Sequence, residues 1–234
     1  MSDLKFQGYA IKDTKKYTEF EVIDFKPKEF GDFDIDIKKG MKVGVAGLGG
    51  LGHYAVQFAV AMGAEVTVFS HQSDKEPDAK KMGATNFVLT SEKEFSKKHA
   101  FEFDFILSTI GMHYSSLTGA FTSLIKSAPF VDDAAGIPLP EFISMLKVHG
   151  TYHQSGLPDK PFEPFSPTAL AGNGASISVN HIGSKKEAKA MLKLAVEKGV
   201  TTYKEILPMR DVGKGIQGVK DNKVRYRYVL KPDF

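Results

Sequence analysis

Three glycines, Gly47, Gly49 and Gly52, stand in G-x-G-x-x-G spacing between an apolar strand pattern and an apolar helix pattern. This spacing suits a turn that holds a diphosphate. The first glycine allows the tight turn, the second lets the anion approach the backbone, and the third lets the helix pack closely on the strand. The helix N-terminus then faces the anion with free N–H groups and a partial positive charge. The sequence therefore predicts a dinucleotide pyrophosphate site.

The residues around the glycines support this prediction, because a glycine triplet alone is weak evidence. Apolar residues at 43–46 precede the glycines, and further apolar residues recur at helical spacing over residues 55–62. Gly63 ends the helix, and a β-branched run at residues 65–69 completes a β-α-β unit of about 30 residues.

The end of this second strand favours NADP(H) over NAD(H). A site that prefers NAD usually places Asp or Glu about 20 residues after the glycines, where it accepts from the ribose 2′-hydroxyl. Here Ser70, Ser73 and Lys75 offer hydroxyls and a cation that suit a 2′-phosphate. Asp74 keeps open the alternative of an ordinary polar turn with a solvated lysine.

The composition indicates a globular protein. With 234 residues, 42% of them hydrophobic, the chain can bury one substantial core and a smaller second lobe. Its 31 basic and 28 acidic residues nearly balance and the lysines are scattered, which argues against a nucleic-acid partner. No stretch reaches about 18 consecutive apolar residues and the N-terminus lacks an apolar signal core, so we expect no membrane partner and a cytoplasmic location.

Metal chemistry has little support in the sequence. The chain contains no cysteine, which removes disulfides, a thiolate nucleophile and thiolate zinc sites. Its seven histidines show neither H-x-x-x-H nor H-E-x-x-H spacing. We predict no bound metal, although a site assembled from residues distant in sequence stays open.

The elements that position these residues form two patterns. From residue 40 onward strands alternate with helices, which predicts an α/β fold with a doubly wound parallel sheet. The expected strands are residues 42–46, 65–70, 86–89, 104–108, 150–154 and 177–182, and the expected helices are residues 51–62, 77–82, 117–125, 138–146 and 185–198.

The two ends of the chain alternate apolar with polar residues, which favours antiparallel strands. These stretches are residues 6–11, 20–25, 33–37, 205–209 and 224–230. We therefore expect residues 40–204 to form the dinucleotide-binding domain, and residues 1–39 and 205–234 to form a small antiparallel β domain.

Six motifs are specific in combination: GLGGLGHYAVQFAVAMGAEVTVFS (residues 47–70), KKMGA (80–84), FDFILSTI (103–110), LKVHGTYHQSGLP (146–158), IGSKKE (182–187) and VRYRYVL (224–230). Together they resemble the cinnamyl-alcohol-dehydrogenase branch of the medium-chain dehydrogenase/reductase family. The resemblance implies a Rossmann domain that binds NADP(H), a remnant of the catalytic domain at the termini, and hydride transfer between alcohols and aldehydes or ketones.

The chain departs from the family at its zinc site. In family members a strand like the one at residues 33–38 leads into the segments that bind catalytic and structural zinc, whereas here Lys38 runs directly into Lys39 and Gly40. We therefore expect an oxidoreductase without zinc. The alternatives are a non-catalytic NADP(H)-binding protein and a domain-deleted alcohol dehydrogenase with little or no activity. Residues 112–136 are longer than the corresponding connection in the family. We expect them to cover apolar surface, and the alternative is a lid over the site.

The resemblance also implies how the coenzyme is held. It implies that the pyrophosphate is bound by Gly47, Gly49, Gly50, Leu51, Gly52 and Arg227, and the adenosine phosphate by Ser70, Ser73 and Lys75. The adenosine ribose would contact Thr109 and Ile110, and the nicotinamide would contact Gly156 and Leu157. The alternative for Arg227 is a strand residue that points into solvent.

Without zinc, a tyrosine or histidine must stabilise or protonate the alkoxide. Tyr152, His153 and His53 are the candidates, because they fall at the strand and helix ends nearest the expected nicotinamide. Each also has a purely structural alternative. Tyr152 would be a core residue, His153 a strand residue that faces the surface, and His53 a residue of the first helical turn that hydrogen-bonds locally. Finally, the edge strand at residues 177–182 predicts a homodimer.

Overall fold

The computed structural model describes residues 6–10, 21–25, 37–111, 138–156, 162, 164–180 and 182–233, the first two stretches as backbone only. The chain divides into two compact units, Met1–Asp36 and Ile37–Phe234. In the first, β1 (Phe6–Ala10) and β2 (Glu21–Phe25) pair antiparallel, as their alternating sequence predicts. The other N-terminal strand that we predicted, at residues 33–37, lies almost entirely outside the described residues.

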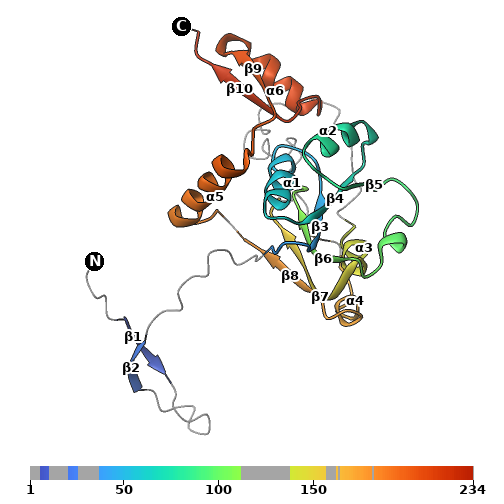
Figure 1. The fold of residues 1–234 in the computed structure, drawn as a ribbon, viewed down its shortest axis with the longest axis vertical. Coiled ribbons are helices and arrows are strands. Elements are labelled where there is room, and N and C mark those ends of the chain that lie inside the picture. Colours follow the sequence, from blue (N-terminus) through green and yellow to red (C-terminus); the bar gives the residue numbers. More distant parts are fainter. Residues whose placement is uncertain are drawn as a thin grey trace, which may run out of the picture. The chain divides into compact units, whose positions relative to one another are not determined.

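The second unit is built on a six-stranded parallel sheet in the order β5-β4-β3-β6-β7-β8 (Figure 1). Its strands are β3 (Lys42–Ala46), β4 (Glu65–Ser70), β5 (Asn86–Leu89), β6 (Phe103–Ser108), β7 (Leu146–Gln154) and β8 (Ser176–Val179). The predicted doubly wound α/β fold is confirmed. The chain reverses its direction across the sheet between β3 and β6, and ligands of such sheets bind beyond the carboxyl ends of the strands at this point.

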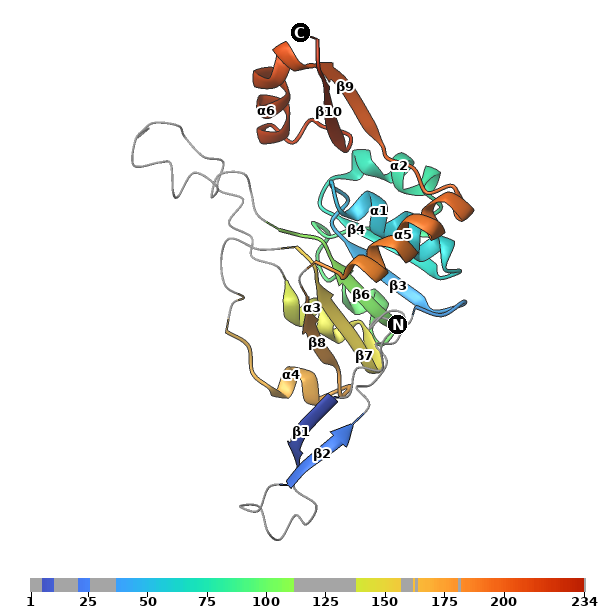
Figure 2. The ribbon, with the colours of Figure 1, turned by 90° about the vertical axis from the view of Figure 1, so that its left-hand side faces the viewer.

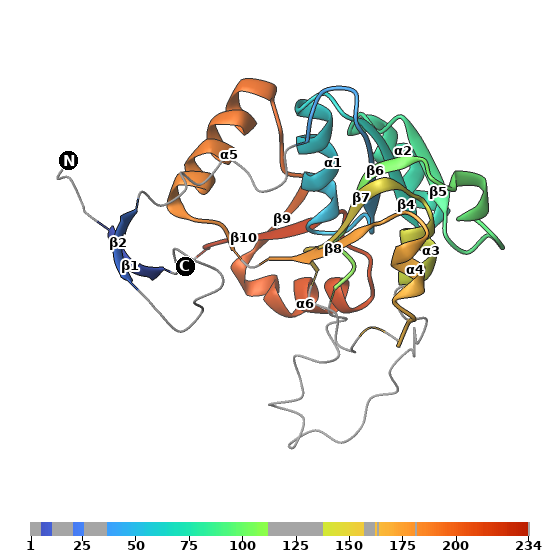
Figure 3. The same ribbon diagram turned by 90° about the horizontal axis from the view of Figure 1, so that it is seen from below.

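Helices cover both faces of the sheet. The connections from β3 to β4 and from β4 to β5 contain α1 (Gly52–Ala61) and α2 (Glu76–Lys81), and the connection from β6 to β7 contains α3 (Leu139–Ser144). The first two run across the sheet in the opposite direction to the third. Because such connections are right-handed, α1 and α2 lie on one face and α3 on the other. Figure 3 shows α1 and α3 on opposite sides of the strands. A four-residue helix, α4 (Thr168–Ala171), packs beside α3 and was not predicted.

An aromatic cluster fills the α3 face of the sheet. Phe142 on α3 is fully buried and meets Phe69 of β4 edge to face, with ring centroids 5.5 Å apart. Phe103 and Tyr152, from β6 and β7, complete this cluster. Such rings contribute about 0.5–1.5 kcal/mol per pair beyond their buried area, so the cluster fixes the strands that carry the predicted site.

Helix α5 (Lys185–Lys198) has the bounds that the sequence predicts, because both ends carry strong local signals. Ser184 accepts a hydrogen bond from the backbone N–H of Glu187 at 3.3 Å, and the Glu187 carboxylate accepts from the Ser184 N–H, which makes a capping box. Gly199 ends the helix with φ +67°. None of the described helices is long and apolar enough to cross a membrane.

One prediction is wrong for the C-terminal lobe, residues 204–231. β9 (Lys204–Pro208) and β10 (Arg227–Lys231) pair in parallel, not antiparallel, because α6 (Val212–Lys220) crosses over between them (Figure 2). Gly218 of α6 lies so close to β10 that a Cβ there would be 2.5 Å from the Tyr228 hydroxyl. The predicted helix at residues 117–125, and the whole segment 112–136 that we expected to cover apolar surface, lie outside the described residues.

Candidate functional site

The glycine turn sits between the end of β3 and the start of α1. Gly47 has φ +90°, a conformation that favours glycine, and its N–H donates to the Phe69 carbonyl at 2.9 Å. Thr109, which follows β6, donates from Oγ1 to the Gly47 carbonyl at 2.8 Å. The turn is therefore held from both neighbouring strands, β4 and β6.

Two other glycines of the turn leave room for different reasons. A Cβ on Gly52 would lie 1.9 Å from the Gly47 carbonyl oxygen, so only glycine lets α1 begin this close to β3. A Cβ on Gly49 would meet nothing within 4 Å, so the space beside Gly49 is open. A tight turn with an open side, ahead of a ten-residue helix, fits a diphosphate.

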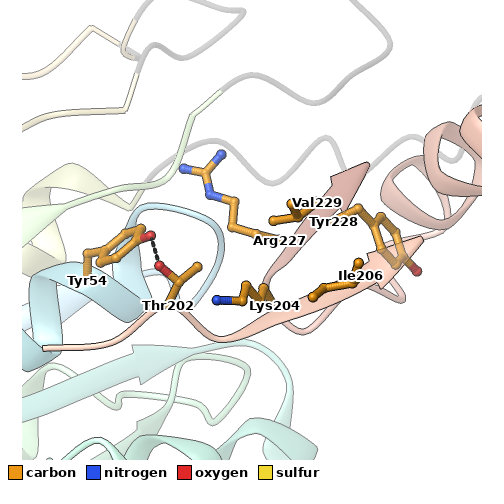
Figure 4. A pocket seen from close by; sticks show the side chains of 7 residues that line it. All are labelled: Tyr54, Thr202, Lys204, Ile206, Arg227, Tyr228 and Val229. Atoms are coloured by element: carbon orange, nitrogen blue, oxygen red, sulfur yellow. Dashed lines mark hydrogen bonds between the residues drawn. The ribbon is translucent and has the colours of Figure 1, made fainter. Parts of the chain in front are cut away.

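Arg227 of β10 reaches this turn from the far end of the chain. Its Nε donates to the Gly50 carbonyl at 3.0 Å, so it does not simply point into solvent, although the residue is exposed. Arg227 lines a pocket together with Tyr54, Thr202, Lys204, Ile206, Tyr228 and Val229 (Figure 4). The Tyr54 and Thr202 hydroxyls share a hydrogen bond of 2.6 Å, which joins α1 to the chain before β9.

His53 lies buried in the first turn of α1. Its ring stacks on Tyr226 at 5.6 Å and lies 4.0 Å from the ring of Tyr54, and Nδ1 is 3.1 Å from the Gly49 carbonyl. Nε2 has no hydrogen-bond partner among the described residues. Burial lowers the pKa of His53, because a charged imidazole would lose its hydration there. His53 thus connects the glycine turn to the C-terminal lobe.

The expected adenosine end lies beyond β4. Ser70 Oγ accepts from the Gln72 N–H at 3.1 Å and so shapes the turn, whereas Ser73 is exposed. Lys75 is only 5% exposed, so the alternative of a solvated lysine is wrong. Burial, aided by the charge of Arg225, lowers the pKa of Lys75.

Sequence reasoning missed the partner of this turn. Arg225, two residues before Arg227, donates from Nη2 to Asp74 Oδ2 at 2.6 Å. The two residues are 151 positions apart, and the only sequence signal was the first arginine of VRYRYVL.

The expected nicotinamide end is organised by a second residue that the sequence did not single out. Gln154, the last residue of β7, donates from Nε2 to the Ile110 carbonyl at 2.7 Å and to the Gly156 carbonyl at 2.8 Å. A Cβ on Gly156 would lie 2.2 Å from the Ile110 carbonyl oxygen, so this approach needs glycine. Leu157 lies outside the described residues.

The three candidate catalytic residues do not lie together. Tyr152 is fully buried on the α3 face, donates to Gln154 Oε1 at 2.7 Å, and has its pKa raised by burial to about 12. His153 faces the opposite side, with Nδ1 2.7 Å from Ser178 Oγ and Nε2 3.0 Å from Asn180 Oδ1. No hydrogen bond or ring contact joins either of them to His53 in the described part of the chain.

The residues that the structure describes do not form a zinc site. The sequence has no cysteine, and the described residues contain no group of three His, Asp or Glu side chains that could hold a metal ion.

Comparison with protein families matches residues 50–197 to the family described as "Zinc-binding dehydrogenase". A probable formaldehyde dehydrogenase of Bacillus subtilis is 32% identical over 195 residues, which are 83% of this chain and 49% of that protein. A probable cinnamyl alcohol dehydrogenase of Nicotiana tabacum is 31% identical over 194 residues, 82% of this chain and 48% of that protein. The chain thus spans about half the length of these curated relatives.

Solved structures of cinnamyl alcohol dehydrogenases also match the chain. A cinnamyl alcohol dehydrogenase of Sorghum bicolor matches with a TM-score of 0.69 and 32% identity, over 82% of this chain and 48% of that one. CAD from Helicobacter pylori, complexed with NADP(H), matches with a TM-score of 0.64 and 30% identity, over 83% of this chain and 48% of that one.

Proposed function

Because this chain belongs to the zinc-binding dehydrogenase family, we propose that it is an NADP(H)-dependent oxidoreductase of alcohol dehydrogenase type, interconverting alcohols with aldehydes or ketones without zinc. The observation that carries the proposal is the geometry of the glycine turn, which leaves an open space beside Gly49. Gly52 is packed against Gly47, Gly49 is open, and Thr109 and Arg227 hold the turn from two sides.

In this proposal each part of the coenzyme meets a defined part of the chain. The glycine turn with Leu51 and Arg227 binds the pyrophosphate, and Thr109 with Ile110 lies beside the adenosine ribose. Gln154 fixes the chain from Ile110 to Gly156, which lines the nicotinamide together with Leu157. When bound, the nicotinamide supplies the hydride acceptor or donor.

The preference for NADP(H) rests on the turn after β4. Ser73 is exposed at this turn, Ser70 and Lys75 belong to it although each is only 5% exposed, and no carboxylate ends β4 itself. The Helicobacter pylori relative was crystallised with NADP(H), which supports the same choice for this chain.

The proposal that the chain acts without zinc rests on its amino-acid composition. Zinc enzymes of this kind need about three protein ligands and an open position, and a chain without cysteine lacks the thiolates that such sites favour. Proton transfer then falls to Tyr152, His153 or His53.

A specific observation favours a second candidate, a non-catalytic NADP(H)-binding protein or a domain-deleted dehydrogenase with little activity. All three proposed proton donors are buried, at 0%, 3% and 0% exposure, and Tyr152 and His153 already have hydrogen-bond partners. A general acid must reach the substrate oxygen, and such closed surroundings oppose that.

Aldehyde-dependent oxidation of NADPH, measured with and without a strong chelator, separates these candidates. Turnover that the chelator leaves unchanged supports the zinc-free enzyme, and turnover that requires added zinc contradicts it. Zero turnover across aldehydes and ketones, together with tight NADPH binding, favours the second candidate. Gly49→Val is the matched control, because it should bind no coenzyme under either.

We also propose a homodimer formed through the edge strand β8, and a cytoplasmic location. β8 ends at Val179, earlier than predicted; among the described residues it is the last strand on its side of the sheet, and Val179 is 59% exposed. An exposed apolar residue on an unpaired edge favours strand addition from a second copy. His181, which the predicted strand included, lies outside the described residues.

A further inference from the structure

The turn after β4 carries a carboxylate where a phosphate-binding site should avoid one. Asp74 lies between Ser73 and Lys75 in the 3-10 turn (Ser73–Lys75), and its side chain is 64% exposed. An uncompensated carboxylate there would repel a phosphate and would favour a coenzyme with a free ribose 2′-hydroxyl.

Arg225 supplies the compensation. Its Nη2 lies 2.6 Å from Asp74 Oδ2, and its Nη1 donates to the carbonyl oxygens of Asn222 at 3.3 Å and Val224 at 3.4 Å. The guanidinium is thus fixed at the turn, yet the side chain stays 29% exposed. An arginine has five donors, and these contacts leave part of its fork free for a further anion.

The segment that carries Arg225 is anchored independently of this ion pair. Tyr226 is 3% exposed, donates from its hydroxyl to Asp78 Oδ2 at 2.9 Å, and stacks on His53. These contacts anchor the segment beside α2 without using Asp74.

Two of the carboxylates at this turn, Asp74 and Asp78, have partners. Arg225 neutralises Asp74, and Lys75, the next residue in the chain, is only 5% exposed. The Asp78 carboxylate beside them is engaged by the Tyr226 hydroxyl and lies 4.0 Å from Lys81. The turn therefore offers the exposed Ser73 and the free part of the Arg225 guanidinium beside one neutralised carboxylate.

We propose that Arg225 is a specificity-determining residue, which cancels the repulsion of Asp74 and offers its guanidinium to a phosphomonoester on the adenosine ribose. The inference rests on the proposed dinucleotide site and names the part of the chain that selects the phosphorylated coenzyme. A planar guanidinium suits this task, because it binds a carboxylate and a phosphate with the same bidentate geometry.

The test compares two coenzymes that differ only in this phosphate. NADPH and NADH are titrated by fluorescence against the wild type, Arg225→Gln and Arg225→Lys. Arg225→Gln should raise the Kd for NADPH on the order of tenfold or more, with the Kd for NADH changed less than about twofold. Arg225→Lys keeps the charge and should lose less. An equal rise for both coenzymes would mean that Arg225 only tethers the lobe, and would overturn the inference.

Asp74→Asn provides an independent test that leaves Arg225 in place. The inference expects NADPH to bind at least as tightly as in the wild type, because the repelling charge is gone. A tether would instead weaken both coenzymes, since the ion pair is broken. A wild type that binds NADPH and NADH equally well overturns the inference alone, whereas a wild type that binds neither overturns the proposed function as well.

Discussion

The Nε of Arg227 lies 3.0 Å from the carbonyl oxygen of Gly50, 177 positions earlier in the chain. Through this hydrogen bond the C-terminal strand β10 touches the glycine turn that follows β3. An arginine beside the first turn of a helix adds a full positive charge to the partial charge of the helix end. The contact therefore joins the two features best suited to an anion.

Replacing Arg227 should weaken both coenzymes alike. Arg227→Gln removes a charged donor from the proposed pyrophosphate site, and the Kd for NADPH and for NADH should rise roughly tenfold to a hundredfold. Calorimetric titration measures both. Arg210→Gln is the control, because Arg210 pairs with Asp233 on the same lobe and lies in no proposed site. Unchanged affinities for Arg227→Gln would remove this residue from the site.

The two glycines of the turn should fail in different ways. Gly49→Val should fold with an unchanged Tm and bind no coenzyme, because its side chain enters space that is open in the protein and assigned to the diphosphate. Gly52→Ala should lose about 1–3 kcal/mol of stability or more, since its Cβ would overlap the Gly47 carbonyl. Thermal melts combined with NADPH titration separate the two effects. Normal NADPH binding by Gly49→Val would contradict the assignment of the open side.

His53 should make the fold sensitive to mild acid. Burial depresses its pKa in the folded state, so the unfolded chain binds more protons between that pKa and about 6.5. Its contribution is therefore destabilising once the pH falls below about 6.5. His53→Phe keeps a ring for the stack on Tyr226 and should reduce the loss of stability between pH 7.5 and 5.5.

Urea unfolding at the two pH values measures this effect. His71→Gln is the control, because His71 is exposed. If the variant at His53 and the wild type lose the same free energy of unfolding on acidification, the buried neutral imidazole is not the cause.

The sequence predicts most of the Rossmann part because its signals are local. The glycine spacing, the β-branched runs of β3 and β4, and the Ser184 to Glu187 capping box each act within a few residues. Helix α6 has a weaker local signal, because VGKGIQGVK holds three glycines that lower helix propensity. The parallel pairing of β9 with β10 follows only once that helix is known.

The missed parts of the site depend on contacts across the chain. Arg225 meets Asp74 over 151 positions, and Tyr226 meets Asp78 over 148. A hydropathy pattern gives the elements but not which side chains the tertiary fold brings together. For the same reason Lys75, a charged residue in a polar turn, gave no sign that it is buried.

The dimer proposal predicts a mass of two chains at tens of micromolar. Val179→Asp places a charge on the exposed edge of β8 and should yield monomers, since a buried carboxylate opposes strand pairing. Val229→Asp, an exposed position on β10, is the matched control and should stay dimeric. Light scattering during gel filtration reads out both, and a wild type that is monomeric at this concentration excludes the dimer.

Titration of the purified protein with NADPH and NADH, followed by coenzyme fluorescence, tests the central claim most directly. The geometry of the glycine turn predicts saturable binding of one coenzyme per chain, lost in Gly49→Val, and the turn after β4 predicts that NADPH binds more tightly than NADH. Binding of neither coenzyme at millimolar concentration would contradict the claim that this turn holds a dinucleotide.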